Sequence, residues 1–174
     1  MKRRCLAVVG AAVICFSALS AAAEAAKIYT DPVFLYSIYY PESWRLKRIG
    51  KYAVLVSPLE SKEDRFAENI SVVAEDLSKL PQNVTLIDYY RQSVGNAKLQ
   101  DFKVLEEART VWMGRDAITN LYTATEKGER FRCKTYTFMV GPIAYVLTYT
   151  AEYSGYETHL PVAERIMRSI RVSP

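Results

Sequence analysis

His159 is the only histidine of the chain, so a Ser-His-Asp or Cys-His arrangement would have to use it as its base. It stands near the start of a C-terminal segment with helical periodicity, a position typical of a surface or capping residue. The phosphate-binding and nucleophile motifs GxGxxG, GxxxxGK[ST] and GxSxG do not occur. The sequence therefore favours a protein without catalysis. The alternatives are a hydrolase that rests on His159 and one that uses carboxylates alone.

The sequence also offers few residues that could bind a metal ion or a cofactor. One histidine cannot be combined with enough cysteines for a zinc site. The segment from Glu60 to Asp64 holds three acidic residues that could bind calcium, but the EF-hand spacing is missing. We therefore expect no cofactor and no metal.

The remaining candidates are binding residues. Pro58–Asn69 is the most charged segment, and its usual interpretation is a solvated loop. The alternative is an interaction loop at one end of a sheet. Thirteen tyrosines favour packing within the sheet, with a ligand surface as the alternative, because tyrosine combines apolar area with a hydroxyl group. The candidate binding residues are Glu63, Asp64, Arg65, Phe66 and Asn69, with Tyr36 and Trp44 outside the loop.

The N-terminus has the three parts of a secretory signal peptide. Met1–Arg4 is basic, Cys5–Ala23 is apolar and rich in alanine, and Ala23-Glu24-Ala25 fits a small-x-small cleavage site. We expect residues 1–25 to be removed and residues 26–174 to form one domain, exported to the periplasm or secreted. An uncleaved membrane anchor is the alternative, because the apolar run is long enough to span a bilayer.

The composition of the mature chain excludes several classes. Cleavage leaves 20 basic and 18 acidic residues, a net charge of +2, and no dense basic stripe that would indicate nucleic-acid binding. Cys133 becomes the only cysteine, so no internal disulfide can form. Its place in an alternating strand predicts a small buried core residue rather than a reactive thiol.

The elements around these residues indicate an α+β domain. Residues 130–140 and 143–151 predict two strands around Gly141-Pro142, and apolar residues on both faces of the first predict a central strand. Residues 102–112 and 117–125 extend this pair to a four-strand meander. Residues 34–40 and 52–57 predict a hairpin with a longer loop, residues 26–32 a lead-in, and residues 70–75 a further strand.

Two helices complete the prediction. Thr85 and Asp88 form a capping-box variant, and apolar spacing predicts a helix from there to about residue 98–100. A second helix is predicted over His159–Arg171, with Pro161 at an early position. The expected fold is an antiparallel sheet of six to seven strands with helices packed on its faces.

Four local motifs in this order resemble the PsbP-like superfamily of α-β-α sandwiches. They are Phe34-x-x-x-Ile38-x-Tyr40-Pro41-x-x-Trp44, Phe66-x-Glu68-Asn69-Ile70-x-Val72, Thr85-Leu86-x-x-Tyr89, and the closing Ile166–Ile170 segment with Ser169. The superfamily includes the photosystem II subunit PsbP, the Mog nuclear-import factors and bacterial envelope proteins such as LpqN and DcrB.

The resemblance spans nearly the whole mature chain and implies a non-catalytic accessory, assembly or binding domain. It supplies no catalytic residue, and it implies that Asn69 satisfies backbone groups where a loop meets a strand. We expect an unidentified envelope protein as the partner. The alternative is a carrier of a small apolar molecule or lipid with a tyrosine-lined cavity. Photosynthetic function does not follow, because a fold does not fix a function.

Overall fold

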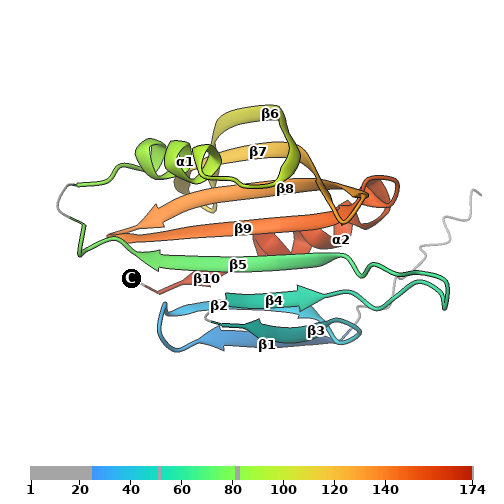
Figure 1. Cartoon of the computed structure of the whole chain (residues 1–174). Coiled ribbons are helices and arrows are strands. Elements are labelled where there is room, and N and C mark those ends of the chain that lie inside the picture. The colour runs from blue at the N-terminus through green and yellow to red at the C-terminus, as the bar shows by residue number, and fades with distance from the viewer. Residues whose placement is uncertain (1–24, 51, 81–82, 174) are drawn as a thin grey trace, which may run out of the picture.

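Two antiparallel sheets and two helices make up the described part of the chain in a computed structural model, which covers residues 25–50, 52–80 and 83–173 (Figure 1). Of the predicted signal segment only Ala25 lies within the described residues. Among these residues the larger sheet has the strand order β3-β4-β5-β9-β8-β7-β6 and the smaller sheet the order β1-β2-β10. The larger sheet contains β3 (Arg45–Ile49), β4 (Tyr52–Val56), β5 (Asn69–Asp76), β6 (Gln100–Trp112), β7 (Arg115–Glu126), β8 (Glu129–Val140) and β9 (Ile143–Glu152). The smaller sheet contains β1 (Ala26–Asp31), β2 (Tyr36–Pro41) and β10 (Arg171–Val172).

Strands β6 to β9 form the predicted four-strand meander, which the structure confirms. Tight two-residue turns connect β6 to β7 and β7 to β8. Both residues of each turn have positive φ: Met113 and Gly114 in the first, Lys127 and Gly128 in the second. This is the backbone combination whose twist matches that of paired antiparallel strands, and glycine adopts it without steric strain. The turns therefore set the pairing register next to them, and β6 departs from it at two register shifts between Gln100 and Glu106.

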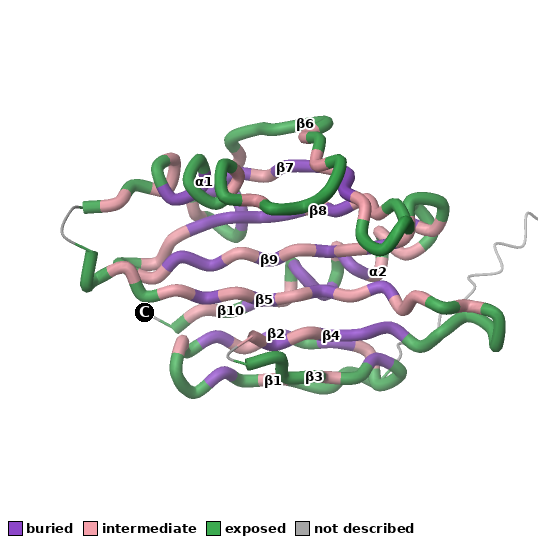
Figure 2. Tube along the Cα trace, in the orientation of Figure 1, coloured by how far each residue is buried: buried purple, intermediate pink, exposed green. Residues whose placement is uncertain are grey.

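The larger sheet is covered on both faces. Helix α1 (Leu86–Gly95) packs on β7 and β8, whereas α2 (Tyr156–Arg168) packs on β9 and β2. Figure 1 shows α2 and β10 behind the sheet, and Figure 2 shows buried segments concentrated in its central strands. From Thr135 to Phe138 every residue of β8 is buried. These layers confirm the predicted α+β architecture and the central position of β8.

Aromatic side chains fill the layer between the larger sheet, α2 and the smaller sheet. Tyr145 and Tyr149 of β9 are at most 1% exposed, and the Tyr145 ring stacks on Phe138 at 5.3 Å between centroids. The Tyr145 hydroxyl donates to the Phe34 carbonyl at 2.7 Å, and the Tyr149 hydroxyl donates to the Tyr156 carbonyl at 3.0 Å. Buried tyrosines need such partners for their hydroxyls. Tyr145, Tyr149 and Tyr156 are therefore core residues, whereas the nearby Tyr153 is 46% exposed.

The helix boundaries differ from the prediction. The Thr85 side chain accepts from the Asp88 N–H and the Asp88 carboxylate accepts from the Thr85 N–H, which confirms the capping box. However, α1 ends at Gly95 with Asn96 as its C-cap, so the expected extension to residues 98–100 is wrong. Glycine is a weak helix former and ends helices readily. The last helix begins at Tyr156 rather than His159, after Gly155.

The predicted N-terminal hairpin is also wrong. Strand β2 pairs with β1 and β10 in the smaller sheet, whereas β4 pairs with β3, a segment expected to be a polar link. Residues 26–31, expected to be a lead-in, form β1. β3 is an edge strand and apart from Leu46 its residues are exposed. Its sequence therefore lacks the apolar alternation that identifies a half-buried strand.

Candidate functional site

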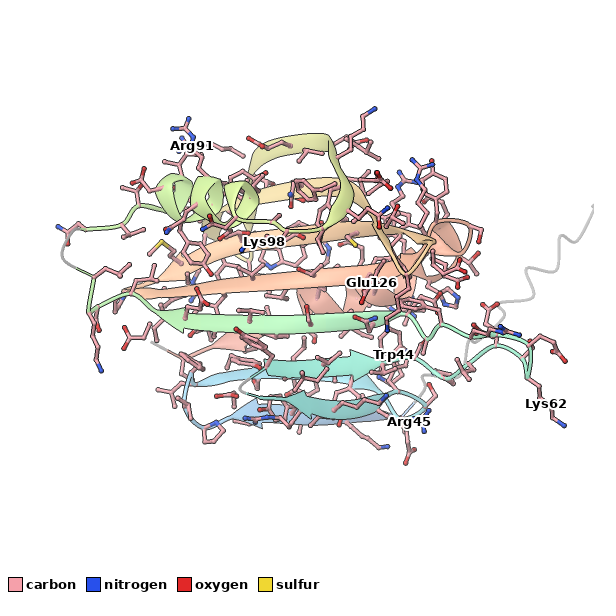
Figure 3. All side chains as sticks on the ribbon, in the orientation of Figure 1. Trp44, Arg45, Lys62, Arg91, Lys98 and Glu126 are labelled. Carbon is pink, nitrogen blue, oxygen red and sulfur yellow. The ribbon has the colours of Figure 1, made fainter. Side chains whose placement is uncertain are left out.

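The charged loop between β4 and β5 projects beyond one end of the larger sheet, with Lys62 at its tip (Figure 3). Its own side chains hold its shape. The Ser61 hydroxyl oxygen accepts from the N–H groups of Glu63 and Asp64 at 3.2 and 3.3 Å. The Asp64 carboxylate accepts from the N–H groups of Glu60 and Phe66 at 2.8 and 3.0 Å. These two backbone donors hold the pKa of Asp64 below its ordinary value.

A groove of about 510 Å³ lies between this loop, the β7–β8 turn and the end of β9. Its apolar part is the pair of rings Phe66 and Phe131, whose centroids are 4.7 Å apart. Five carboxylate residues and two cationic residues line it, so its formal charge is strongly negative. We call it the loop-end groove; its lining residues are Glu63, Asp64, Arg65, Phe66, Glu126, Lys127, Glu129, Phe131 and Glu152.

Most of the charged groups in the loop-end groove face solvent. Glu63, Arg65, Glu126, Lys127 and Glu129 are all exposed. Solvent-exposed charges of this kind contribute little to folding stability. A cluster with one dominant sign instead creates a surface potential that attracts an oppositely charged partner and speeds its association. The groove therefore combines an excess of negative charge with an apolar pair of phenyl rings.

His159 anchors the base of the loop to the start of α2. Its Nε2 atom lies 2.7 Å from Glu60 Oε1 and 3.5 Å from Glu68 Oε2. The Glu68 side chain is only 6% exposed and accepts from the Ser57 hydroxyl at 3.3 Å. A Cβ atom on Gly155 would lie 3.3 Å from Glu68 Oε1, so glycine leaves room for this carboxylate. Together these contacts hold the loop against the start of α2, which is far from it in sequence.

Burial raises the pKa of Glu68 above its ordinary value, although the backbone N–H, the His159 charge and the Ser57 hydroxyl act in the opposite direction. A buried carboxylate beside an imidazole is a pattern of catalytic sites as well as of structural ones. Here Ser57 donates to Glu68, and the two close partners of the imidazole Nε2 atom are carboxylates. This is the geometry of a structural anchor, since a second carboxylate stands where the nucleophile of a triad would be.

Cys133 supplies no alternative nucleophile. It is 4% exposed, and burial raises the pKa of its thiol, which disfavours the reactive thiolate. Within the described residues no group of three or more His, Cys, Asp and Glu side chains is arranged to hold a metal ion. In the same part of the chain, neither helix is long and apolar enough to cross a membrane.

The structure brings together four of the predicted binding residues, Glu63, Asp64, Arg65 and Phe66, in the loop-end groove. Asn69 lies at the start of β5, where its amide donates to the Ala67 carbonyl at 3.4 Å. Tyr36 and Trp44 lie elsewhere, in the hydrophobic core, and are 2% and 4% exposed. Their burial gives them no surface on which a partner could dock.

The opposite wall of the loop-end groove was not predicted. Glu126, Lys127 and Glu129 come from the β7–β8 turn, and Phe131 and Glu152 from the strands that follow. Figure 3 shows Glu126 at this turn. The signal available in the sequence was the Glu126-Lys127-Gly128-Glu129 turn itself, whose composition resembles that of the charged loop. Placing the two segments at the same end requires the strand order of the sheet.

Neither the scan of protein-family models nor the search of curated proteins found a match. Solved structures do match. A Pseudomonas aeruginosa protein of unknown function, described as a putative regulator, is 16% identical with a TM-score of 0.62, over 86% of this chain and 98% of its own. Cyanobacterial PsbP from Synechocystis is 15% identical with a TM-score of 0.62, over 88% and 96%.

LpqN from Mycobacterium tuberculosis, described as involved in cell envelope biogenesis, is 13% identical with a TM-score of 0.60, over 89% of this chain and 88% of its own. At such identities the likeness concerns the fold and not the activity. It confirms, at that level, the resemblance expected from the four sequence motifs. The chain has a PsbP-like fold.

Proposed function

We propose that this chain is a non-catalytic accessory domain of the cell envelope that binds a protein partner through the loop-end groove. The observation that carries the proposal is the convergence of the charged loop and the β7–β8 turn on one acidic groove with an aromatic pair. The partner would present a basic segment with at least one apolar side chain. Electrostatic attraction would set its association rate, and the Phe66–Phe131 pair would hold its apolar side chain.

Three further observations support this assignment. The N-terminal sequence has the pattern of a secretory signal. One protein with the same fold, LpqN, is described as involved in envelope biogenesis. The single histidine is held between carboxylates at the base of the loop rather than beside a nucleophile. An accessory role is consistent with all three, whereas a hydrolase that rests on His159 would need a use for this residue beyond anchoring.

Affinity capture from the native envelope fraction tests the proposal. The bait is residues 26–174, and the eluates are analysed by mass spectrometry for proteins and for lipids. The charge-reversal variant is Glu63→Lys with Glu129→Lys, two exposed residues of the groove. Asp64 stays intact because it holds the loop. The matched control is Glu42→Lys with Asp116→Lys, two exposed residues outside the groove that carry the same change in charge.

The expected result is a specific protein that the wild type and the control capture and that the groove variant loses. A partner that both variants retain equally would contradict the groove as the contact surface. A lipid or small molecule in the eluate, without any protein, would overturn the protein-binding function and make the carrier function the leading one.

A further inference from the structure

A second groove, of about 340 Å³, lies on the α2 face of the larger sheet, where the helix does not extend over β6 and β7. We call it the Trp112 groove and define it by Thr110, Trp112, Thr119, Arg132, Tyr136 and Leu160. Its floor is the sheet and one wall is α2. The volume is in the range of sites for small molecules and too small for a folded segment. A third cavity, under α1, is only about 130 Å³.

Trp112 is a largely enclosed aromatic residue of this groove. It is 2% exposed, stacks on Tyr136 with 3.7 Å between ring centroids, and carries the Arg168 guanidinium 4.6 Å above its ring. Nevertheless its indole Nε1 is buried without a hydrogen-bond partner. A buried donor without an acceptor carries a free-energy penalty, and such groups are rare in folded proteins.

Arg132, on β8, provides a second unused donor. One terminal nitrogen donates to Glu157 at 2.8 Å, and the guanidinium lies 4.3 Å from the centroid of the Tyr156 ring. Its Nε is buried without a partner. Arg132 and Trp112 therefore both line the groove, and each has a buried N–H group whose hydrogen bond is unmade.

Three acidic residues, Glu106, Glu107 and Glu157, line the groove together with the cations Arg132, Lys134 and Arg168, so its formal charges balance. Glu164, on α2 beside the groove, is compensated as well. Glu164 Oε1 accepts from the Tyr136 hydroxyl at 2.9 Å and forms an ion pair with Lys134. Its Oε2 makes no hydrogen bond, but it lies 3.3 Å from Arg168 Nε. The charge of Glu164 is thus balanced within the protein. Within the described residues, none of these acidic side chains and no other acceptor forms a hydrogen bond with the two buried N–H groups.

We propose that the Trp112 groove binds a small organic carboxylate, which accepts from Trp112 Nε1–H and is attracted by the Arg132 guanidinium. The apolar body of the ligand lies on the sheet between Thr110, Thr119 and Leu160. A carboxylate suits such a donor because its oxygens have free lone pairs, and hydrogen bonds to an ionised acceptor are the stronger kind. This site is separate from the loop-end groove. It gives the small-molecule alternative a defined location and a defined class of ligand.

The test uses phenylacetate as the probe and phenethyl alcohol as its uncharged counterpart. The readout is the indole N–H resonance of Trp112 in two-dimensional NMR, which Trp112→Phe identifies because the chain has two tryptophans. We expect phenylacetate to shift this resonance saturably and to bind about tenfold or more tightly than the alcohol, the difference expected of a hydrogen bond to a charged group.

Two variants separate binding from folding. Trp112→Phe keeps the stacked ring and removes the donor, and Arg132→Met keeps the apolar stem and removes the guanidinium. Calorimetry should show each binding phenylacetate about tenfold or more weakly. The matched control is Arg109→Met, on the opposite face of β6, which should bind within about twofold of the wild type. Absence of saturable binding, equal affinity for the alcohol, or unchanged affinity in both groove variants would each overturn the site.

Discussion

The loop-end groove and the Trp112 groove differ in the exposure and the charge of their polar groups. In the loop-end groove the charges are exposed, predominantly negative and carried by a loop and a turn. In the Trp112 groove the decisive groups are buried N–H donors on strands of the larger sheet. Exposed charges favour rapid association with a large partner, whereas buried donors discriminate between small ligands. The same fold thus offers one surface suited to a protein and one suited to a small molecule.

The first and largest expected difference concerns stability. Trp112→Ala should lower the free energy of unfolding by about 3–5 kcal/mol, because it removes a buried ring that stacks on Tyr136. Phe66→Ala removes a half-buried ring at the end of the molecule and should cost about 1–2 kcal/mol. Urea denaturation measures both. Equal losses would contradict the distinction between a packed groove and a peripheral one.

The second difference concerns ion pairs. Lys134 and Glu164 are 26% and 18% exposed and also contact Tyr136. A double-mutant cycle with Lys134→Met and Glu164→Gln should give a coupling energy of about 1–2 kcal/mol. The equivalent cycle for Glu60 and His159, with Glu60 60% exposed, should give less than about 1 kcal/mol. A larger coupling energy for Glu60 and His159 would mean that their contact is more rigid than the 60% exposure of Glu60 indicates.

The third expectation is a pH dependence at the base of the loop. Because burial raises the pKa of Glu68 in the folded state, the native protein holds this proton more tightly than the unfolded chain. The resulting stabilisation is full below the ordinary value of 4.5 and is lost as the pH rises through the folded pKa. Relative to Glu68→Gln, the wild type should lose stability across that window in pH-dependent urea denaturation. A difference that is constant with pH would contradict the shift.

The smallest effect is local. Asp64→Asn weakens the acceptor for the Glu60 and Phe66 N–H groups, so hydrogen exchange should become faster at these two amides while the midpoint of thermal unfolding stays nearly unchanged. Glu63→Gln, next to it in the loop, is the control and should leave both amides as they are. Equal acceleration in the two variants would show that charge alone, and not the Asp64 hydrogen bonds, orders the loop.

The elements that could be predicted from the sequence are those with a strong local signal. The meander has alternating strands and positive-φ turns, and α1 has its capping box. The sequence does not predict β10 because its partner β2 is more than a hundred residues away, and it does not predict β1 and β3 because mostly exposed strands have no apolar alternation. Contacts of that kind depend on topology rather than on local propensity.

The two grooves, like the fold, consist of parts with a local sequence signal and parts without one. Glu63 to Phe66 are contiguous, so their charge pattern indicated half of the loop-end groove. Its other half and the whole Trp112 groove combine segments that only strand order brings together. Tyr36 and Trp44, predicted as binding residues, both lie in the core, since residue type alone does not separate an aromatic residue of an interface from a packed one.

The most direct test of the central claim is site-specific photo-crosslinking in the native envelope fraction. A photoreactive phenylalanine analogue replaces Glu129, in the loop-end groove, or Glu42, an exposed residue outside it. The account predicts one protein adduct from position 129 and none of that mass from position 42. Adducts of the same partner from both positions, or from position 42 alone, would contradict the loop-end groove as the surface through which this domain acts.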